Sequence, residues 1–119
     1  MSKGISVSTA TDFRRLALSL EGTTEVPHFE RAAFKVARIF VTLGPDGLEA
    51  NFKFMPDEQD LKCLTHPEAF SPVPNAWGRQ GWTSANLAAL TEAELRDALV
   101  LAWRHAQKTP KPGKRRTAA

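Results

Sequence analysis

The sequence has little cysteine and no long apolar stretch. Its 119 residues contain one cysteine, Cys63, which excludes an internal disulfide and any zinc site rich in cysteine. No apolar run approaches the ~18–20 residues of a membrane span, and no charged-then-apolar leader opens the chain. With ordinary hydrophobic (42%) and charged (24%) fractions, these absences predict a soluble, cytoplasmic protein that makes no contact with a membrane.

The common signatures of catalysis are missing as well. The sequence has no GxSxG, Walker or GxGxxG motif, and its three histidines, His28, His66 and His105, lack the spacing of a helical metal site. Nothing in the sequence gives Cys63 the base and the electropositive setting that a nucleophile needs. We therefore expect a protein that is not an enzyme and that uses no cofactor and no metal.

Acidic residues are missing from the C-terminal end, which divides the chain into two parts. All 13 Asp and Glu lie at or before Asp97, whereas five of the 16 Lys and Arg lie within residues 108–119. Residues 1–107 therefore carry a formal charge of −2 and residues 108–119 carry +5. We predict one domain over residues 1–107 and a disordered basic tail over residues 108–119, so the pI near 9.4 is a property of the tail.

The spacing of the apolar residues predicts an α+β domain. Helical spacing after Thr9 predicts a first helix that stops at Gly22, and the Thr91–Glu94 capping box opens a last helix. The other expected elements are a connection at 22–30, three strands within 34–36, 39–43 and 48–54, a short helix from Pro56 to Pro67, a loop of extended pieces at 67–82 and a strand at 81–87. The order α-β-β-β-α-(β)-β-α predicts an antiparallel β-sheet with helices packed on one face.

The same spacing assigns an inward and an outward side to these elements. Trp103 shares the apolar side of the last helix and is expected in the core, and Leu61 and Leu64 are expected to face inward from the short helix. The outward side of the three-stranded meander would display Lys35, Phe40, Thr42, Asn51 and Lys53, with Arg31 and Arg38 near its ends.

Two surfaces have the composition of a nucleic-acid site. One is this outward side of the meander, where lysines accompany an expected exposed Phe. The other is the loop 75–82, which places Arg79 between Trp77 and Trp82. Tryptophan stacks on bases, and arginine pairs with phosphates or guanine edges. Each surface also has a structural interpretation, since strand faces are often solvated and both tryptophans could plug the edge of the sheet.

An ordered set of short motifs resembles the MmcQ/YjbR family. The set comprises Leu20–Glu25, Pro27-His28-Phe29, Phe34-Lys35-Val36, Pro56-Asp57-Glu58, Pro74–Gly78 and Gly81-Trp82-Thr83, and it spans roughly residues 10–107. The resemblance implies an α+β domain with a frataxin-like core, a "double wing" fold to which DNA binding is attributed. It implies no catalytic residue. The iron binding of frataxin-like proteins uses an acidic ridge, which Asp12 and Glu21 alone do not make here.

We therefore predict a small DNA-binding protein whose binding is weak and of low sequence specificity. The predicted contact residues are Lys35, Arg38, Lys53, Trp77, Arg79, Trp82, Lys114, Arg115 and Arg116. The alternative is a protein-interaction module that docks a protein partner on the tryptophan loop or the sheet face.

Overall fold

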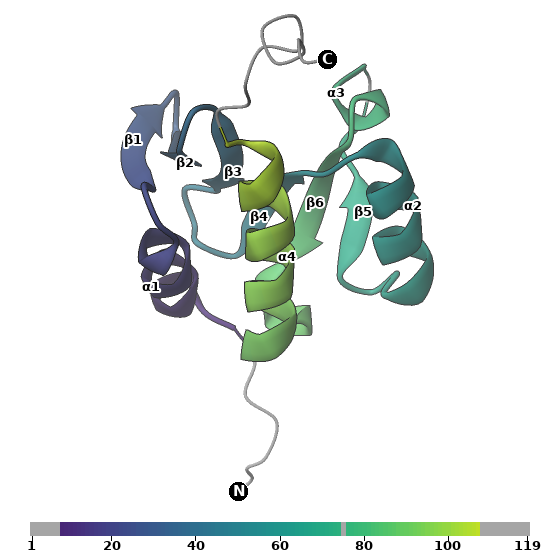
Figure 1. The fold of residues 1–119 in the computed structure, drawn as a ribbon. Helices are drawn as coiled ribbons and strands as arrows, with labels where there is room; N and C mark the ends of the chain where they lie inside the picture. Colours follow the sequence, from purple (N-terminus) through teal and green to yellow (C-terminus); the bar gives the residue numbers. More distant parts are fainter. Residues whose placement is uncertain (1–7, 75, 108–119) are drawn as a thin grey trace, which may run out of the picture.

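The chain folds into a six-stranded antiparallel sheet with helices against it (Figure 1). The computed structural model describes residues 8–74 and 76–107. In chain order, the elements are α1 (Ala10–Ser19), β1 (Thr24–His28), β2 (Arg31–Lys35), β3 (Ile39–Leu43), β4 (Glu49–Lys53), α2 (Pro56–Thr65), β5 (Phe70–Pro72), α3 (Ala76–Arg79), β6 (Trp82–Asn86), the 3₁₀ turn η1 (Leu87–Ala89) and α4 (Glu92–His105). The spatial order of the strands is β1-β2-β3-β4-β6-β5. The α+β class and the antiparallel sheet are confirmed.

Both long amphipathic helices begin at capping boxes. At α1, the hydroxyl of Thr9 accepts from the Asp12 backbone N–H, and the Asp12 carboxylate accepts from the Thr9 N–H. At α4, Thr91 and Glu94 make the same reciprocal pair. These contacts satisfy backbone donors that a helix start leaves without partners, which confirms both predicted N-termini.

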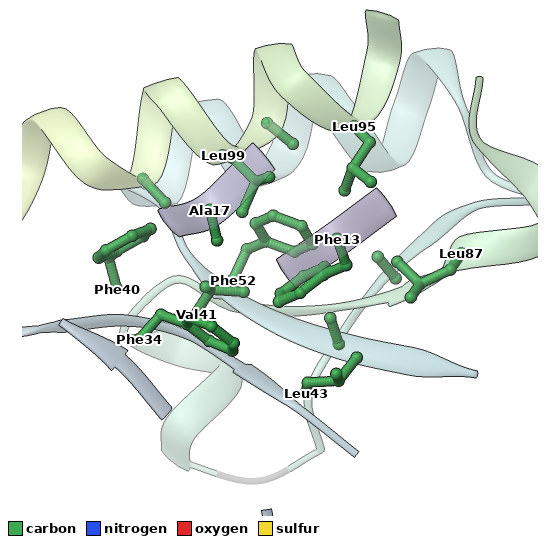
Figure 2. Close-up of a cluster of buried hydrophobic side chains, with 14 of the residues drawn as sticks. Phe13, Ala17, Phe34, Phe40, Val41, Leu43, Phe52, Leu87, Leu95 and Leu99 are labelled. Atoms are coloured by element: carbon green, nitrogen blue, oxygen red, sulfur yellow. The ribbon is translucent and has the colours of Figure 1, made fainter. Parts of the chain in front are cut away.

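The core lies between one face of the sheet and the helices α1 and α4 (Figure 2). Phe13 of α1 meets Phe34 of β2 edge-on, with ring centroids 5.3 Å apart, and Phe52 of β4 stacks on Phe54 at 5.6 Å. Leu95 and other apolar residues of α4 complete the cluster. Edge-on and offset aromatic contacts of this kind add to the stabilisation that comes from burial alone.

The stretch 22–30 is not a connection. It contains β1, which pairs antiparallel with β2 through a two-residue turn at Phe29 and Glu30. Pro27 in this strand argued against regular pairing because proline lacks a backbone N–H. Since β1 is an edge strand, that missing donor costs no hydrogen bond within the sheet. The meander therefore has four strands rather than three.

Phe40 is buried in the core and is not displayed on the outward side. The pairing of β2 with β3 shifts between Phe34, which lies opposite Val41, and Lys35, which lies opposite Ile39. Phe40 is the extra residue of this bulge, and a bulge turns the local strand enough to redirect a side chain. Figure 2 shows Phe40 among the core side chains, together with Val41.

Helix α2 turns a polar side inward, so the expectation for its leucines is wrong. Leu61 and Leu64 are 60% and 78% exposed. Gln59, Lys62 and His66 lie on the inward side instead. Three ion pairs join this region to α4: Lys62 with Asp97, His66 with Glu94, and Glu58 with His105. The same side of α2 also packs toward β5, where the Lys62 ammonium lies 5.6 Å from the centre of the Phe70 ring.

Two further expectations are revised. The loop 67–82 contains the one-turn helix α3, although its prolines and glycines argued against any helix, whereas the short strand β5 agrees with the extended pieces expected there. Trp103 packs against the core but is only half-buried, and its indole N–H donates to the Glu21 carbonyl at 3.0 Å.

Candidate nucleic-acid interface on the open sheet face

The face of the sheet opposite α1 and α4 is here called the open face. Side chains alternate across a strand, so the pairing register places one set of residues on this face. Its members include Val26 and His28 of β1, Arg31, Ala33 and Lys35 of β2, Thr42 of β3, Glu49, Asn51 and Lys53 of β4, and Trp82 and Ser84 of β6. Of the predicted site residues, Lys35, Lys53 and Trp82 are thereby brought onto one surface.

A small pocket opens on this face. It has a volume of about 200 Å³ and is lined by His28, Arg31, Thr42, Asn51, Val73, Trp77 and Trp82. Trp82 belongs to the sheet itself, whereas Trp77 comes from α3 and lines the pocket together with residues of β1 to β4. Trp77 is 58% exposed, so it does not plug the sheet edge. The structure thus joins the two surfaces that the sequence suggested separately.

The segment that carries the two tryptophans is held by backbone contacts. The side-chain amide of Gln59 donates to the carbonyls of Gly78 and Trp82, at 2.9 and 3.0 Å. Gly81 has a φ of +109°, and a Cβ there would collide with the Phe54 carbonyl. Only glycine fits this position without strain. The placement of Trp77 relative to Trp82 is therefore fixed by α2 and by the turn at Gly81.

Asn51 lies at the centre of the open face. Its cross-strand neighbours are Thr42 on β3 and Ser84 on β6, and its side chain is half-buried. Among the described residues, none forms a hydrogen bond with the Asn51 carboxamide, whereas the hydroxyl of Thr42 accepts from Arg31 at 2.8 Å. The pocket therefore contains one amide whose donors and acceptors remain available to a ligand.

Four predicted contact residues in the described part of the chain make no ion pair. Within residues 8–74 and 76–107, Lys35, Arg38, Lys53, Arg79 and Arg104 make no salt bridge, and every other Lys and Arg makes at least one. Arg38 nevertheless has a structural contact, since its guanidinium donates to the His105 carbonyl at the end of α4, at 2.9 Å. Lys114, Arg115 and Arg116 lie outside the described residues.

The sequence interpretation missed the tip of the β1–β2 hairpin. Phe29 is 94% exposed and has a φ of +61°, and its ring contacts that of His28, with centroids 4.9 Å apart. Positive φ is unfavourable for a bulky residue and costs about 1–3 kcal/mol. The alternation of Thr24, Val26 and His28 could have revealed this strand, but Pro27 led to the stretch being interpreted as a connection.

Three other features of the described part of the chain bear on function: the Cys63 thiol, the potential metal ligands and the helices. Burial raises the pKa of the Cys63 thiol, and Asp60 adds to the shift, so the thiol is a weaker nucleophile than an ordinary cysteine. Residues 8–74 and 76–107 contain no group of three or more His, Cys, Asp or Glu that could hold a metal ion. Over the same residues, no helix is both long and apolar enough to cross a bilayer.

A family model supplies the relationship of this chain to known proteins. The YjbR model matches residues 18–105, which run from α1 to the end of α4. The chain belongs to the YjbR family. This YjbR domain resembles the crystal structure of the Deinococcus radiodurans protein DR2400, which has a DUF419 domain, with a TM-score of 0.67 and 21% identity over 78% of this chain and 74% of that one. At this identity, the likeness shows the fold alone. No curated protein matches the chain.

Proposed function

We propose that this YjbR domain binds DNA through its open face, weakly and with little sequence preference, and that it catalyses no reaction. The observation that carries the proposal is the position of Lys35 and Lys53. Both lie on the same face as Trp82, and neither is neutralised by a carboxylate among the described residues. An unpaired lysine can exchange its counterion for a phosphate without first breaking an ion pair.

The charge distribution supports weak rather than tight binding. Residues 1–107 have a net charge of −2, so the domain as a whole does not attract a polyanion. The local positive charge of the open face has to act against that total. The five cations of residues 108–119 follow Gln107 in the chain and add a second, sequence-independent attraction. The experiment must therefore separate the face from the tail.

A salt titration of DNA binding, on the full chain and on a chain ending at Gln107, makes this separation. The core residues all precede Gln107, so the shorter chain keeps the entire core. If five tail cations contact phosphates, the slope of log K against log [salt] is about −4 to −5, since each contact adds roughly −0.9 on duplex DNA. We expect the shortened chain to retain weak binding with a shallower slope.

Charge-matched variants then test the face itself. Lys35→Gln with Lys53→Gln removes two open-face cations and should abolish the residual binding of the shortened chain. Arg15→Gln with Arg96→Gln removes the same charge from α1 and α4, where both guanidiniums pair with Glu92, and should have a much smaller effect. Loss of all binding on removing residues 108–119, with unchanged circular dichroism, would refute binding by the domain.

The second candidate is a protein-interaction module centred on the tryptophan loop. The exposure of Trp77 favours it, because a large exposed apolar side chain at a rigid position is typical of a docking site. The two functions differ in their salt dependence, since an apolar protein contact does not release the counterions of a polyanion. Binding to the open face that is insensitive to salt would favour the protein partner.

A further inference from the structure

We infer that the pocket between Trp77 and Trp82 accepts one unpaired nucleobase, so that the form of DNA bound by the open face is single-stranded. This inference rests on the proposed function and adds the class of ligand and the residue that contacts the base edge. It depends on the size of the pocket, the chemistry of its lining and the cations beside it.

The pocket is the right size for one flat group. Its volume is about 200 Å³, below the ~300–1,000 Å³ of sites that enclose a drug-sized ligand. The two indoles and Val73 supply its apolar surface, and the sheet supplies its polar surface. Aromatic side chains bind the π-face of any base, which agrees with binding of low sequence preference.

Asn51 is the residue best placed to bond with the edge of that base. Two other polar groups of the pocket are already engaged, because Arg31 bonds with Glu49 and its guanidinium also donates to the Thr42 hydroxyl. The Asn51 carboxamide offers both a donor and an acceptor. An asparagine amide forms paired hydrogen bonds with a base edge that presents the complementary donor and acceptor.

A duplex does not meet these requirements. Its bases are stacked on one another and their pairing edges are occupied, so a base must be unstacked and unpaired before it can lie between Trp77 and Asn51. In a single strand the bases have no partner strand, so their pairing edges are already free. Its phosphates can then contact Lys53, which is the direct cross-strand neighbour of Trp82. Base and phosphate sites thus lie side by side on β4 and β6.

The test compares three DNA probes of equal length on the full, unaltered chain at one salt concentration. The probes are single-stranded oligothymidine, a single strand with abasic sites throughout, and a duplex. We expect the oligothymidine to bind about five- to 150-fold more tightly than the abasic strand, which is the usual range for one base stacked on an aromatic side chain. It should also bind more tightly than the duplex and quench tryptophan fluorescence.

Two variants locate the effect. Trp77→Ala and Asn51→Leu should each remove most of the preference for oligothymidine and leave the affinity for the abasic strand unchanged. Leu64→Ala, which removes an exposed apolar side chain from α2, serves as the control and should change neither affinity. Thermal unfolding of each variant shows whether the fold is intact.

The outcomes also distinguish the inference from the proposed function. Equal affinity for oligothymidine and the abasic strand would overturn the base pocket while leaving phosphate binding in place. Tighter binding to the duplex than to the single strand would overturn it too. No binding to any of the three probes would refute the proposed function together with the inference. Because these comparisons use the unaltered chain, a variant that failed to fold would not affect them.

Discussion

Arg31 on β2 and Glu49 on β4 form a two-pronged ion pair that crosses over β3. The guanidinium donates to both carboxylate oxygens, at 2.6 and 3.1 Å, and also to the hydroxyl of Thr42 between them. Bidentate arginine–carboxylate pairs are among the strongest charged hydrogen bonds in proteins. Here the pair also neutralises one cation of the open face, which leaves Lys35 and Lys53 as its unpaired positive charges among the described residues.

Glu49→Gln should therefore strengthen DNA binding. The substitution removes a negative charge from the open face and leaves Arg31 available to a phosphate. One additional contact should steepen the slope of log K against log [salt] by about 0.7 on single strands or 0.9 on duplex DNA. Glu92→Gln, which makes the same charge change between α1 and α4, is the matched control. Weaker binding by Glu49→Gln would show that the ion pair organises the site.

The exposed Phe29 should lower stability while it aids binding. Its positive φ lies at the first central position of a two-residue turn, where glycine is favoured. Phe29→Gly should raise the free energy of unfolding by about 1 kcal/mol, as relief of strain exceeds the entropy cost of glycine. Phe29→Ala keeps the strained backbone and should not stabilise.

Both substitutions at residue 29 remove the ring beside His28, which lines the pocket. If that ring contacts the bound strand, they should weaken oligothymidine binding equally, although only one of them is stabilising. Urea unfolding and fluorescence titration measure the two effects. A glycine variant that is more stable and binds as well as the parent would exclude Phe29 from the interface.

The parts of the fold that the sequence predicted are those decided by local patterns. The helix start after Thr9, the capping box at Thr91 and the apolar sides of α1 and α4 depend on residues a few positions apart, and the structure confirms them. Two errors came from contacts between elements, which the spacing within one element does not specify. The inward side of α2 carries ion pairs with α4, such as that of Lys62 with Asp97, and the position of Phe40 depends on a bulge in the pairing of β2 with β3.

The sequence predicted the candidate site as two separate surfaces. The order of the strands in the sheet is what brings these two surfaces together. Lys53 and Trp82 lie far apart in the sequence and become neighbours only because β6 pairs with β4 across the intervening α2, β5 and α3. The residue types were visible in the sequence, as outward positions of a strand and as a tryptophan loop. The pocket between them could not be predicted without the order of the strands in the sheet, and no local sequence pattern specifies that order.

Acid should weaken the start of α4. The Thr91 backbone N–H donates to the Glu94 carboxylate and lowers its pKa below the ordinary value of 4.5, and His66 adds to the shift. Because the folded pKa is the lower one, this stabilisation is fully present above pH 4.5 and is lost as the pH falls through the folded pKa. Glu94→Gln keeps the cap but does not titrate, so its urea stability should fall less between pH 7 and pH 3 than that of the parent. Parallel curves for the two proteins would contradict this assignment.

Trp103 should stabilise the domain without taking part in binding. Its ring packs against the core on the helix side of the sheet, and its N–H joins α4 to the Glu21 carbonyl just after α1. Removal of a fully buried tryptophan costs about 3–5 kcal/mol, so for this half-buried one we expect Trp103→Ala to cost about 2–3 kcal/mol. Trp103→Phe keeps most of the packing and loses the hydrogen bond, with an expected cost of about 1 kcal/mol. Both variants should bind oligothymidine with unchanged affinity when measured well below their melting temperatures. Because Trp77 and Trp82 remain, the bound strand should still quench fluorescence in Trp103→Phe, and loss of quenching there would place the contact on the helix side instead of the open face.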